Sequence, residues 1–405
     1  MTASVPGTPS LLRAINDRAA LEALLAHGSL SRPELGRLTG LSKPTAGQLL
    51  ARLEQAGLVL RDGIREGSPG RTAELYRLNP AAAHAAALDV TPERIAATVA
   101  DLAGTVLGEY ELPTPGRSAG DVVARAAAAV DGAAAAAGLT RDRIDRAVIG
   151  IQGALDPATG RLGYASHLPG WHGPGICDRL AAGLGLPVEI ENDVNLAALA
   201  ELAAGQAAGV RDFVLLWVFA GVGMGIVLDG VLHRGATGGA GEIGYMPAAD
   251  APLVRGVRRG GTGPVQSLTG GPAVLRLLRA HGFRGHDATV ALRRAVAALD
   301  GGAGPQAAER AEQARAALTE LATRLAATLA TVVAVLDPGM IVLSGDVLRA
   351  GGEPLRDLVE EQLHTLTVPR PTVRLGSVEG NPILAGALQL ALRDVREEVF
   401  TRSLP

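Results

Sequence analysis

Residues 31–57 read SRPELGRLTGLSKPTAGQLLARLEQAG, a stretch with two helix starts and two helix ends. Ser31 and Ser42 are each followed two residues later by proline, and serine before an early proline is typical of a helix N-terminus. Gly40 and Gly57 close the two segments, because glycine readily adopts the left-handed conformation found at helix ends. The stretch therefore predicts two short helices joined by a tight turn.

The flanking sequence extends this helix pair into a larger unit. Leucine and isoleucine recur at helical spacing over residues 9–27, which predicts a preceding helix. Two extended segments, 58–61 and 73–78, surround the glycine- and proline-rich turn 66–71, which predicts a hairpin. Three helices followed by a hairpin describe a winged helix-turn-helix, so we expect a DNA-binding head over residues 1–80.

The second helix of the motif carries the residues expected to read DNA. Thr45, Gln48 and Arg52 share the face opposite its leucines. Gln pairs bidentately with adenine, and Thr contacts the thymine methyl group. Lys43 at the helix start suits phosphate or guanine, and Arg71 at the wing tip suits the minor groove or its phosphates. In the alternative, a helical hairpin packed on another surface, Gln48 and Arg52 belong only to a solvated face.

The charge is distributed unevenly along the 405 residues. The first 80 residues hold ten Lys and Arg against seven Asp and Glu, whereas the remainder holds 28 against 34. A basic head on an acidic body suits a head that contacts phosphates. The length and the 47% hydrophobic content predict two or three folded domains.

Cysteine content and the N-terminal sequence bear on the compartment. Cys177 is the single cysteine, which excludes a disulfide framework and a cysteine zinc cage. The N-terminal stretch lacks the basic-then-apolar order of a signal peptide, and no run reaches the roughly 18 apolar residues of a membrane span. We therefore expect a cytoplasmic protein with no membrane partner.

Beyond residue 85, strands and helices alternate, which predicts an α/β body. The expected strands are 85–90, 95–100, 105–111, 146–151, 188–190, 213–219, 225–228 and 340–344. The expected helices are 121–138, 174–184, 194–204, a helical zone over 271–336, 353–363 and 382–397.

Ordered motifs in the body and head resemble one family. They are Glu191–Glu201 (ENDVNLAALAE), Phe219–Gly225 (FAGVGMG), Gly238–Tyr245 (GGAGEIGY), Leu41–Thr45 (LSKPT), and Gly70-Arg71 with Leu78-Asn79-Pro80. Over nearly the whole chain they resemble the ROK family of repressors, open reading frames and sugar kinases. The resemblance implies an actin-like, hexokinase-like body with two lobes around a cleft. We place the lobes at residues 81–190 and 191–405, with the last helix packing back on the first lobe.

The resemblance also implies a sugar site. Asn192, Asp193 and Glu242 are expected to contact sugar, since carboxylates and amides bind vicinal hydroxyls. Gly153 lets a backbone approach the ring closely, and His167 lies in a segment that borders the sugar in such proteins. Asp193 has a second interpretation, as the N-cap of the following helix, and the two roles are compatible. Asp193 would also be the general base in a family kinase.

The phosphate side departs from the kinase pattern. Family kinases carry Asp-x-Gly-Gly-Thr, whose backbone amides hold phosphates, whereas this chain has Asp89-Val-Thr-Pro-Glu-Arg94. Pro92 has no amide hydrogen, Glu93 adds negative charge, and Arg94 replaces a lysine. We therefore expect no kinase activity and no nucleotide cofactor. The glycine motif 221–225 survives, yet a tight hairpin turn explains it equally well.

The zinc site of the family is also absent from the sequence. Tyr245 stands where the family has histidine, and residues 259–266 contain no cysteine, so we expect no metal. Gln266 falls near the position of a further sugar-binding glutamate. Both Tyr245 and Gln266 retain groups that hydrogen-bond a hydroxyl.

These features predict a sugar-responsive DNA-binding regulator, which we expect to be a repressor. Its partners are a double-stranded DNA operator, a monosaccharide or sugar derivative, and a second copy of the chain, since palindromic half-sites require two-fold symmetry. A dimer or higher homo-oligomer is therefore expected. Two alternatives remain: an ATP-dependent sugar kinase carrying a DNA-binding head, and a regulator whose cleft no longer binds a ligand.

Overall fold

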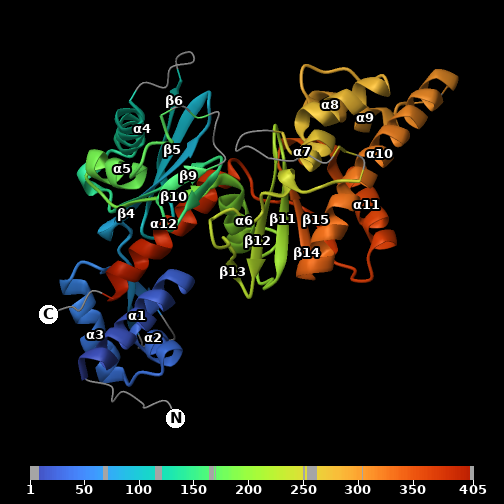
Figure 1. The fold of residues 1–405 in the computed structure, drawn as a ribbon. Coiled ribbons are helices and arrows are strands. Elements are labelled where there is room, and N and C mark those ends of the chain that lie inside the picture. The colour runs from blue at the N-terminus through green and yellow to red at the C-terminus, as the bar shows by residue number, and fades with distance from the viewer. Residues whose placement is uncertain are drawn as a thin grey trace, which may run out of the picture.

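The computed structural model describes residues 9–66, 72–114, 121–163, 168, 170–249, 251–252, 262–302 and 304–401. A small N-terminal head lies at one end of the molecule, and two larger lobes, each built on a sheet, follow it (Figure 1). Helix α12 runs from between the lobes back to the head (Figure 1).

The head is the predicted winged helix-turn-helix. Its elements are α1 (Pro9–His27), β1 (Leu30–Ser31), α2 (Arg32–Thr39), α3 (Lys43–Gln55), β2 (Val59–Glu66) and β3 (Thr72–Leu78). The strands form an antiparallel sheet in the order β1-β3-β2. The Glu34 carboxylate starts α2 by accepting from the Ser31 backbone N–H at 2.8 Å and from the Ser31 hydroxyl at 2.7 Å. Gly40 then ends α2 in the left-handed conformation, with a φ of 71°, which glycine adopts readily at helix ends.

The first lobe is a five-stranded sheet with the order β10-β7-β4-β5-β6. Its strands are β4 (His84–Val90), β5 (Arg94–Asp101), β6 (Val106–Pro113), β7 (Arg146–Ile151) and β10 (Val188–Asn192). β10, β7 and β4 run parallel, and β5 and β6 are antiparallel. Every residue of β4 is buried, because α4 (Val122–Ala136) and α5 (Ile176–Leu184) cover one face of the sheet and α12 covers the other. The hairpin β8 (Ala154–Asp156) and β9 (Arg161–Gly163) lies beside β10.

The second lobe is another five-stranded sheet, β13-β12-β11-β14-β15. Its strands are β11 (Phe213–Val218), β12 (Val222–Leu228), β13 (Val231–Leu232), β14 (Met340–Ser344) and β15 (Thr372–Leu375). Helix α6 (Asp193–Ala204) packs on one face. On the other face lie α8 (Gly271–Ala280), α9 (Ala288–Leu299), α10 (Pro305–Leu336) and α11 (Asp346–Leu366), with α7 (Pro264–Thr269) beside them. The predicted helical zone 271–336 is thus three helices, separated at glycine-containing turns.

Helix α10 is long and apolar enough to cross a membrane by length and composition. Its buried face, which includes Leu318, Leu321, Leu325 and Leu329, packs into the core of the second lobe. A core helix passes the same test, so α10 is explained by its packing.

Helix α12 (Pro382–Thr401) joins the parts of the molecule. It packs against β4, β7 and α6 of the body and against α1 of the head. One buried apolar cluster includes Leu21 and Leu24 of α1, Leu53 of α3, and Val395 and Phe400 of α12. The core of the head therefore continues into the core of the body.

Candidate functional site

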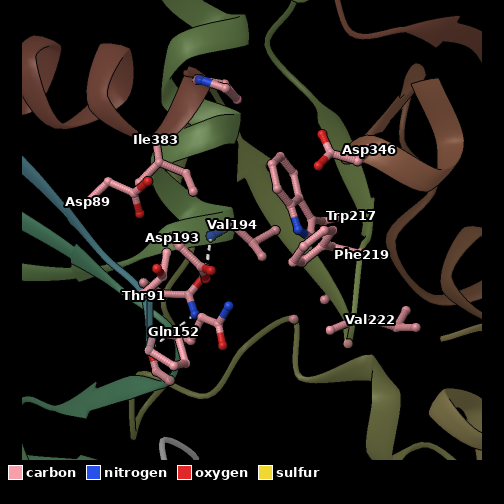
Figure 2. Close-up of a pocket in the computed structure, with 18 of the residues that line it drawn as sticks. Asp89, Thr91, Gln152, Asp193, Val194, Trp217, Phe219, Val222, Asp346 and Ile383 are labelled. Atoms are coloured by element: carbon pink, nitrogen blue, oxygen red, sulfur yellow. Dashed lines mark hydrogen bonds between the residues drawn. The ribbon is translucent and has the colours of Figure 1, made fainter. Parts of the chain in front are cut away.

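A cavity of about 980 Å³ lies where the two lobes meet. Its walls come from the β4–β5 loop, the segment after β7, the start of α6, the β11–β12 turn, residues 238–245, α7 and the start of α12. Asp89, Thr91, Gln152 and Asp193 lie on one side, and Trp217, Phe219, Val222 and Asp346 lie on the other (Figure 2).

The cavity brings together six of the seven residues predicted to bind sugar. They are Gly153, Asn192, Asp193, Glu242, Tyr245 and Gln266. His167 lies outside the described residues. The sequence motifs that place these side chains are up to 113 positions apart, from Gly153 to Gln266, so their convergence comes from the two-lobed fold. Their contacts with a sugar remain a prediction.

Asn192 holds the start of α6. Its side-chain oxygen accepts from the backbone N–H of Val194 at 2.9 Å and of Asn195 at 3.0 Å, and its Nδ2 donates to the Gly153 carbonyl at 3.0 Å. The sequence interpretation of Asp193 as the N-cap is wrong, because Asn192 is the cap and Asp193 is the first helical residue. Gly153 has a φ of 114°, a conformation that favours glycine.

Asp193 is a buried carboxylate of the cavity, with 8% of its surface exposed. Its Oδ1 accepts from the Val194 N–H at 2.9 Å. Burial, together with the nearby Asp89 and Glu242 charges, raises the pKa of Asp193 to about 7. Burial likewise raises the pKa of Glu242 to about 7. Near neutral pH, both carboxyl groups can therefore donate or accept a hydrogen bond to a hydroxyl.

Tyr245 and Gln266 also line the cavity. Tyr245 ends the short helix η3 (Ile243–Tyr245), and Gln266 lies on α7. A Cβ atom on Gly244 would lie 3.1 Å from Gln266 Oε1, so the absence of a side chain there gives the glutamine room beside the cavity.

In the loop after β4, residues 91–94, the backbone amides form hydrogen bonds within the loop itself. The Thr91 hydroxyl accepts from the N–H groups of Glu93 at 3.3 Å and Arg94 at 3.2 Å, and the Thr91 N–H donates to the Arg94 carbonyl at 2.9 Å. Pro92 has no N–H. All four residues of the loop thus lack a free amide for a phosphate.

Arg94, the last residue of this loop, forms ion pairs with two carboxylates. Arg94 Nη2 lies 3.2 Å from Asp89 Oδ2, and Arg94 Nε lies 3.3 Å from Glu111 Oε2. Asp89 also accepts from Asn381 Nδ2 at 2.8 Å. Arg94 Nη1 is buried and has no hydrogen-bond partner among the described residues. The arginine therefore lies between two carboxylates on the wall of the cavity.

The glycine motif 221–225 forms a tight hairpin. Val218 pairs with Val222 across the β11–β12 turn, and the Phe219 N–H donates to the Gly221 carbonyl at 3.0 Å. A Cβ atom on Gly225 would lie 2.6 Å from the Cβ of Ala198 on α6. Turn geometry and close packing on α6 are sufficient to explain these glycines.

The head exposes part of the predicted DNA-reading set. Lys43, Thr45 and Gln48 are exposed on α3. Arg52 instead forms an ion pair with Asp17 of α1, and the two side chains are 27% and 9% exposed. Arg71 lies outside the described residues. A DNA contact by Arg52 remains a prediction, and the structure gives this side chain a partner within the head.

The sequence interpretation missed two residues of the cavity and one candidate on the head. Gln152 and Asn381 line the cavity. Asn381 precedes Pro382, an arrangement typical of a helix start, so the sequence contained a signal for it. Arg37, near the end of α2, is exposed and has no ion-pair partner among the described residues. It joins Lys43 as a candidate for phosphate contact.

Comparisons with known proteins agree with this architecture. The ROK family model matches residues 85–394, and the MarR family model matches residues 15–70. The putative xylose repressor of Caldicellulosiruptor sp. (strain Rt8B.4) is 25% identical over 96% of this chain and 98% of its own length.

Two solved structures share the fold. A ROK family transcriptional regulator, a homolog of the E. coli MLC protein, matches with a TM-score of 0.73 at 21% identity, covering 96% of this chain and 99% of its own. The ROK hexokinase from Thermus thermophilus matches with a TM-score of 0.62 at 29% identity, covering 78% of this chain and 99% of its own. The predicted fold, a hexokinase-like body behind a winged head, is confirmed.

Proposed function

Because the chain belongs to the ROK family and carries a MarR-type winged head, we propose that it is a sugar-responsive, DNA-binding repressor that acts in the cytoplasm. The observation that carries this proposal is the combination of exposed polar side chains on α3 with a polar cavity beside which loop 91–94 hydrogen-bonds its own backbone amides. In this proposal, binding of an effector in the cavity controls DNA binding by the head.

The effector proposed for the cavity is a monosaccharide or a sugar derivative. Asp193 and Glu242 face the cavity as carboxyl groups, and Gln152 and Gln266 add amides, which suits adjacent hydroxyls that each donate and accept. The xylose repressor that matches over almost its whole length makes D-xylose the first sugar to test. D-Glucose is the second, because ROK glucokinases share the body.

The DNA-reading residues proposed for the head are Lys43, Thr45 and Gln48, with Arg37 contacting phosphate. These side chains lie at the end of α2 and along the start of α3, and the start of a recognition helix enters the major groove. Two heads are required to bind a palindromic operator, so the proposed active form is a homodimer or a higher symmetric oligomer.

The experiment that tests this function is a gel-shift titration with DNA from upstream of the protein's own gene. We expect the full-length protein to retard this fragment, and D-xylose or D-glucose to change the protein concentration required. The double variant Thr45→Ala, Gln48→Ala should lose the shift while keeping its sugar-dependent rise in melting temperature. Absence of a shift in the wild type under all conditions would refute the proposal.

The kinase alternative is tested on the same preparation. Asp193 would be the general base in a family kinase, but the backbone amides of loop 91–94 are taken by hydrogen bonds within the loop. We expect no ADP release above background with ATP and D-xylose, D-glucose or N-acetylmannosamine. Sugar-dependent ADP release that disappears in Asp193→Asn would establish the kinase instead.

A further inference from the structure

One helix connects the cavity with the head. Asn381, Pro382 and Ile383 line the cavity at the start of α12, and the helix continues for 20 residues to Thr401. At 1.5 Å per residue, such a helix is about 30 Å long. Its far end lies beside α1 of the head (Figure 1).

The cavity end of α12 is attached to the β4–β5 side of the cleft. Asn381 Oδ1 caps the helix by accepting from the N–H groups of Ile383 at 2.9 Å and Leu384 at 3.3 Å. The same side chain donates to Asp89 at 2.8 Å. Asp89 is 3% exposed and Asn381 is partly buried, and both residues line the cavity. We therefore expect a shift of the end of β4 to be transmitted to the start of α12.

The head end of α12 is attached to α1, and α1 is attached to the recognition helix α3. Arg18 Nη1 lies 2.8 Å from Glu397 Oε1 of α12. The adjacent residue, Asp17, holds Arg52 of α3 in an ion pair. Two neighbouring side chains of α1 thus contact α12 on one side and α3 on the other.

Packing makes these polar contacts parts of one continuous body. The buried cluster that contains Leu21 and Leu24 of α1 also contains Leu53 of α3 and Phe400 of α12. Close-packed interiors move as units rather than deforming continuously. A displacement of α12 is therefore expected to move α1 and α3 together.

We propose that Asp17 and Arg18 are positioning residues that fix the recognition helix relative to α12, so that α12 carries the state of the cavity to the DNA-reading face. In this arrangement Arg52 holds α3 in place on α1 through its ion pair with Asp17. The inference rests on the proposed function, because it concerns how sugar binding changes DNA binding.

The test compares two adjacent carboxylates of α12. Glu397→Ala removes the contact with Arg18, whereas Glu398→Ala removes an ion pair with Arg146, which lies within the body on β7. The readout is the ratio of the Kd for the upstream DNA fragment with and without saturating D-xylose, or D-glucose if that sugar is the one that acts. We expect the ratio in Glu397→Ala to fall about three-fold or more towards one, within the usual range of allosteric coupling, and Glu398→Ala to keep the wild-type ratio.

A charge-swapped variant separates positioning from simple loss of packing. Arg18 also pairs with Glu22 on α1, at 2.8 Å, so Glu22→Gln is included. Arg18→Glu combined with Glu22→Gln and Glu397→Arg restores an ion pair of opposite polarity and should recover most of the ratio. The wild-type ratio in Glu397→Ala, or an equal loss in Glu398→Ala, would overturn the proposal.

Hydrogen exchange of the full-length protein without sugar or DNA tests the same contact independently of the effector. Glu397→Ala should raise amide exchange in α3, residues 43–55, several-fold over the wild type, and Glu398→Ala should not. Unchanged exchange in α3 overturns the coupling. A wild type that responds to no sugar would refute the proposed function, while the exchange result would still decide the coupling.

Discussion

The amide of Asn381 donates to the carboxylate of Asp89 at 2.8 Å, and the two residues are 292 positions apart in the chain. Asp89 is the penultimate residue of β4, the central strand of the first lobe, and Asn381 immediately precedes α12. The bond therefore ties the sheet of the first lobe to the helix that reaches the head.

Removing this amide should destabilise the fold measurably. Asn381→Ala loses an N-cap, which costs about 1 kcal/mol, and a hydrogen bond to a buried carboxylate, which is worth about 1.5–3 kcal/mol. We expect a loss of about 2–4 kcal/mol in the free energy of unfolding, measured by urea denaturation. Asp121→Ala is the matched control, because Asp121 caps α4 on an exposed surface, and it should lose only about 1 kcal/mol. Equal losses in the two variants would contradict a role for the Asp89 contact.

The raised pKa values of Asp193 and Glu242 predict a pH dependence of stability with a definite sign. Each group has a folded-state pKa of about 7 and an ordinary value near 4. Between these values the folded protein holds a proton that the unfolded chain has released, so each group makes stability fall as pH rises, by up to about 1.4 kcal/mol per unit. Above about pH 7 the loss is complete.

The variant Asp193→Asn isolates this contribution, because asparagine mimics the protonated acid at every pH. The difference in unfolding free energy between Asp193→Asn and the wild type should grow in favour of the variant from pH 5 to pH 7 and level off above. Denaturant titrations at five pH values measure this difference in unfolding free energy. The contributions of titrating groups common to both proteins cancel in the difference. A difference that does not change with pH would show that Asp193 titrates normally.

Local sequence signals were sufficient for most of the fold. Serine, proline and glycine at fixed offsets placed α2 and α3, and the continuous apolar run of β4 matched a strand buried on both faces. The cap of α6 was misassigned because Asn192 and Asp193 are adjacent and both side chains can cap. Only the backbone conformation, which is extended at Asn192, distinguishes them.

Long-range side-chain contacts could not be predicted. Helical spacing put Arg52 on the face of Thr45 and Gln48, but the flexible arginine side chain bends to Asp17, 35 positions earlier. The partner of Asn381 could not be predicted either, because Asp89 lies on β4, 292 positions earlier in the chain. Helical periodicity predicts the direction of a Cβ atom. It does not predict which charged residue a long polar side chain will pair with.

Two exposed residues of α3 should affect DNA binding in different ways. Lys43→Ala is expected to weaken binding to all sequences and to lower the slope of log Kd against log salt by about one, because it removes one phosphate contact. Gln48→Ala should cost about 1–3 kcal/mol on the preferred operator and leave the slope unchanged, because it removes a base contact. Gln55→Ala, at the exposed end of the same helix, is the control. Fluorescence anisotropy at four salt concentrations separates the two effects, and equal slopes for all three variants would refute the assignment of Lys43.

The pair formed by Asp17 and Arg52 gives a prediction that discriminates between two roles of the arginine. If Arg52 positions α3 through Asp17, then Asp17→Ala and Arg52→Ala each weaken operator binding, and the double variant is no weaker than the worse single variant, since both remove one contact. If Arg52 reads a base, Asp17→Ala releases the guanidinium towards the DNA and leaves binding unchanged or stronger. Anisotropy titrations of the four proteins distinguish these outcomes, with circular dichroism confirming that each variant is folded. We expect the non-additive result, because Asp17 is only 6% exposed and a carboxylate so shielded requires its cationic partner.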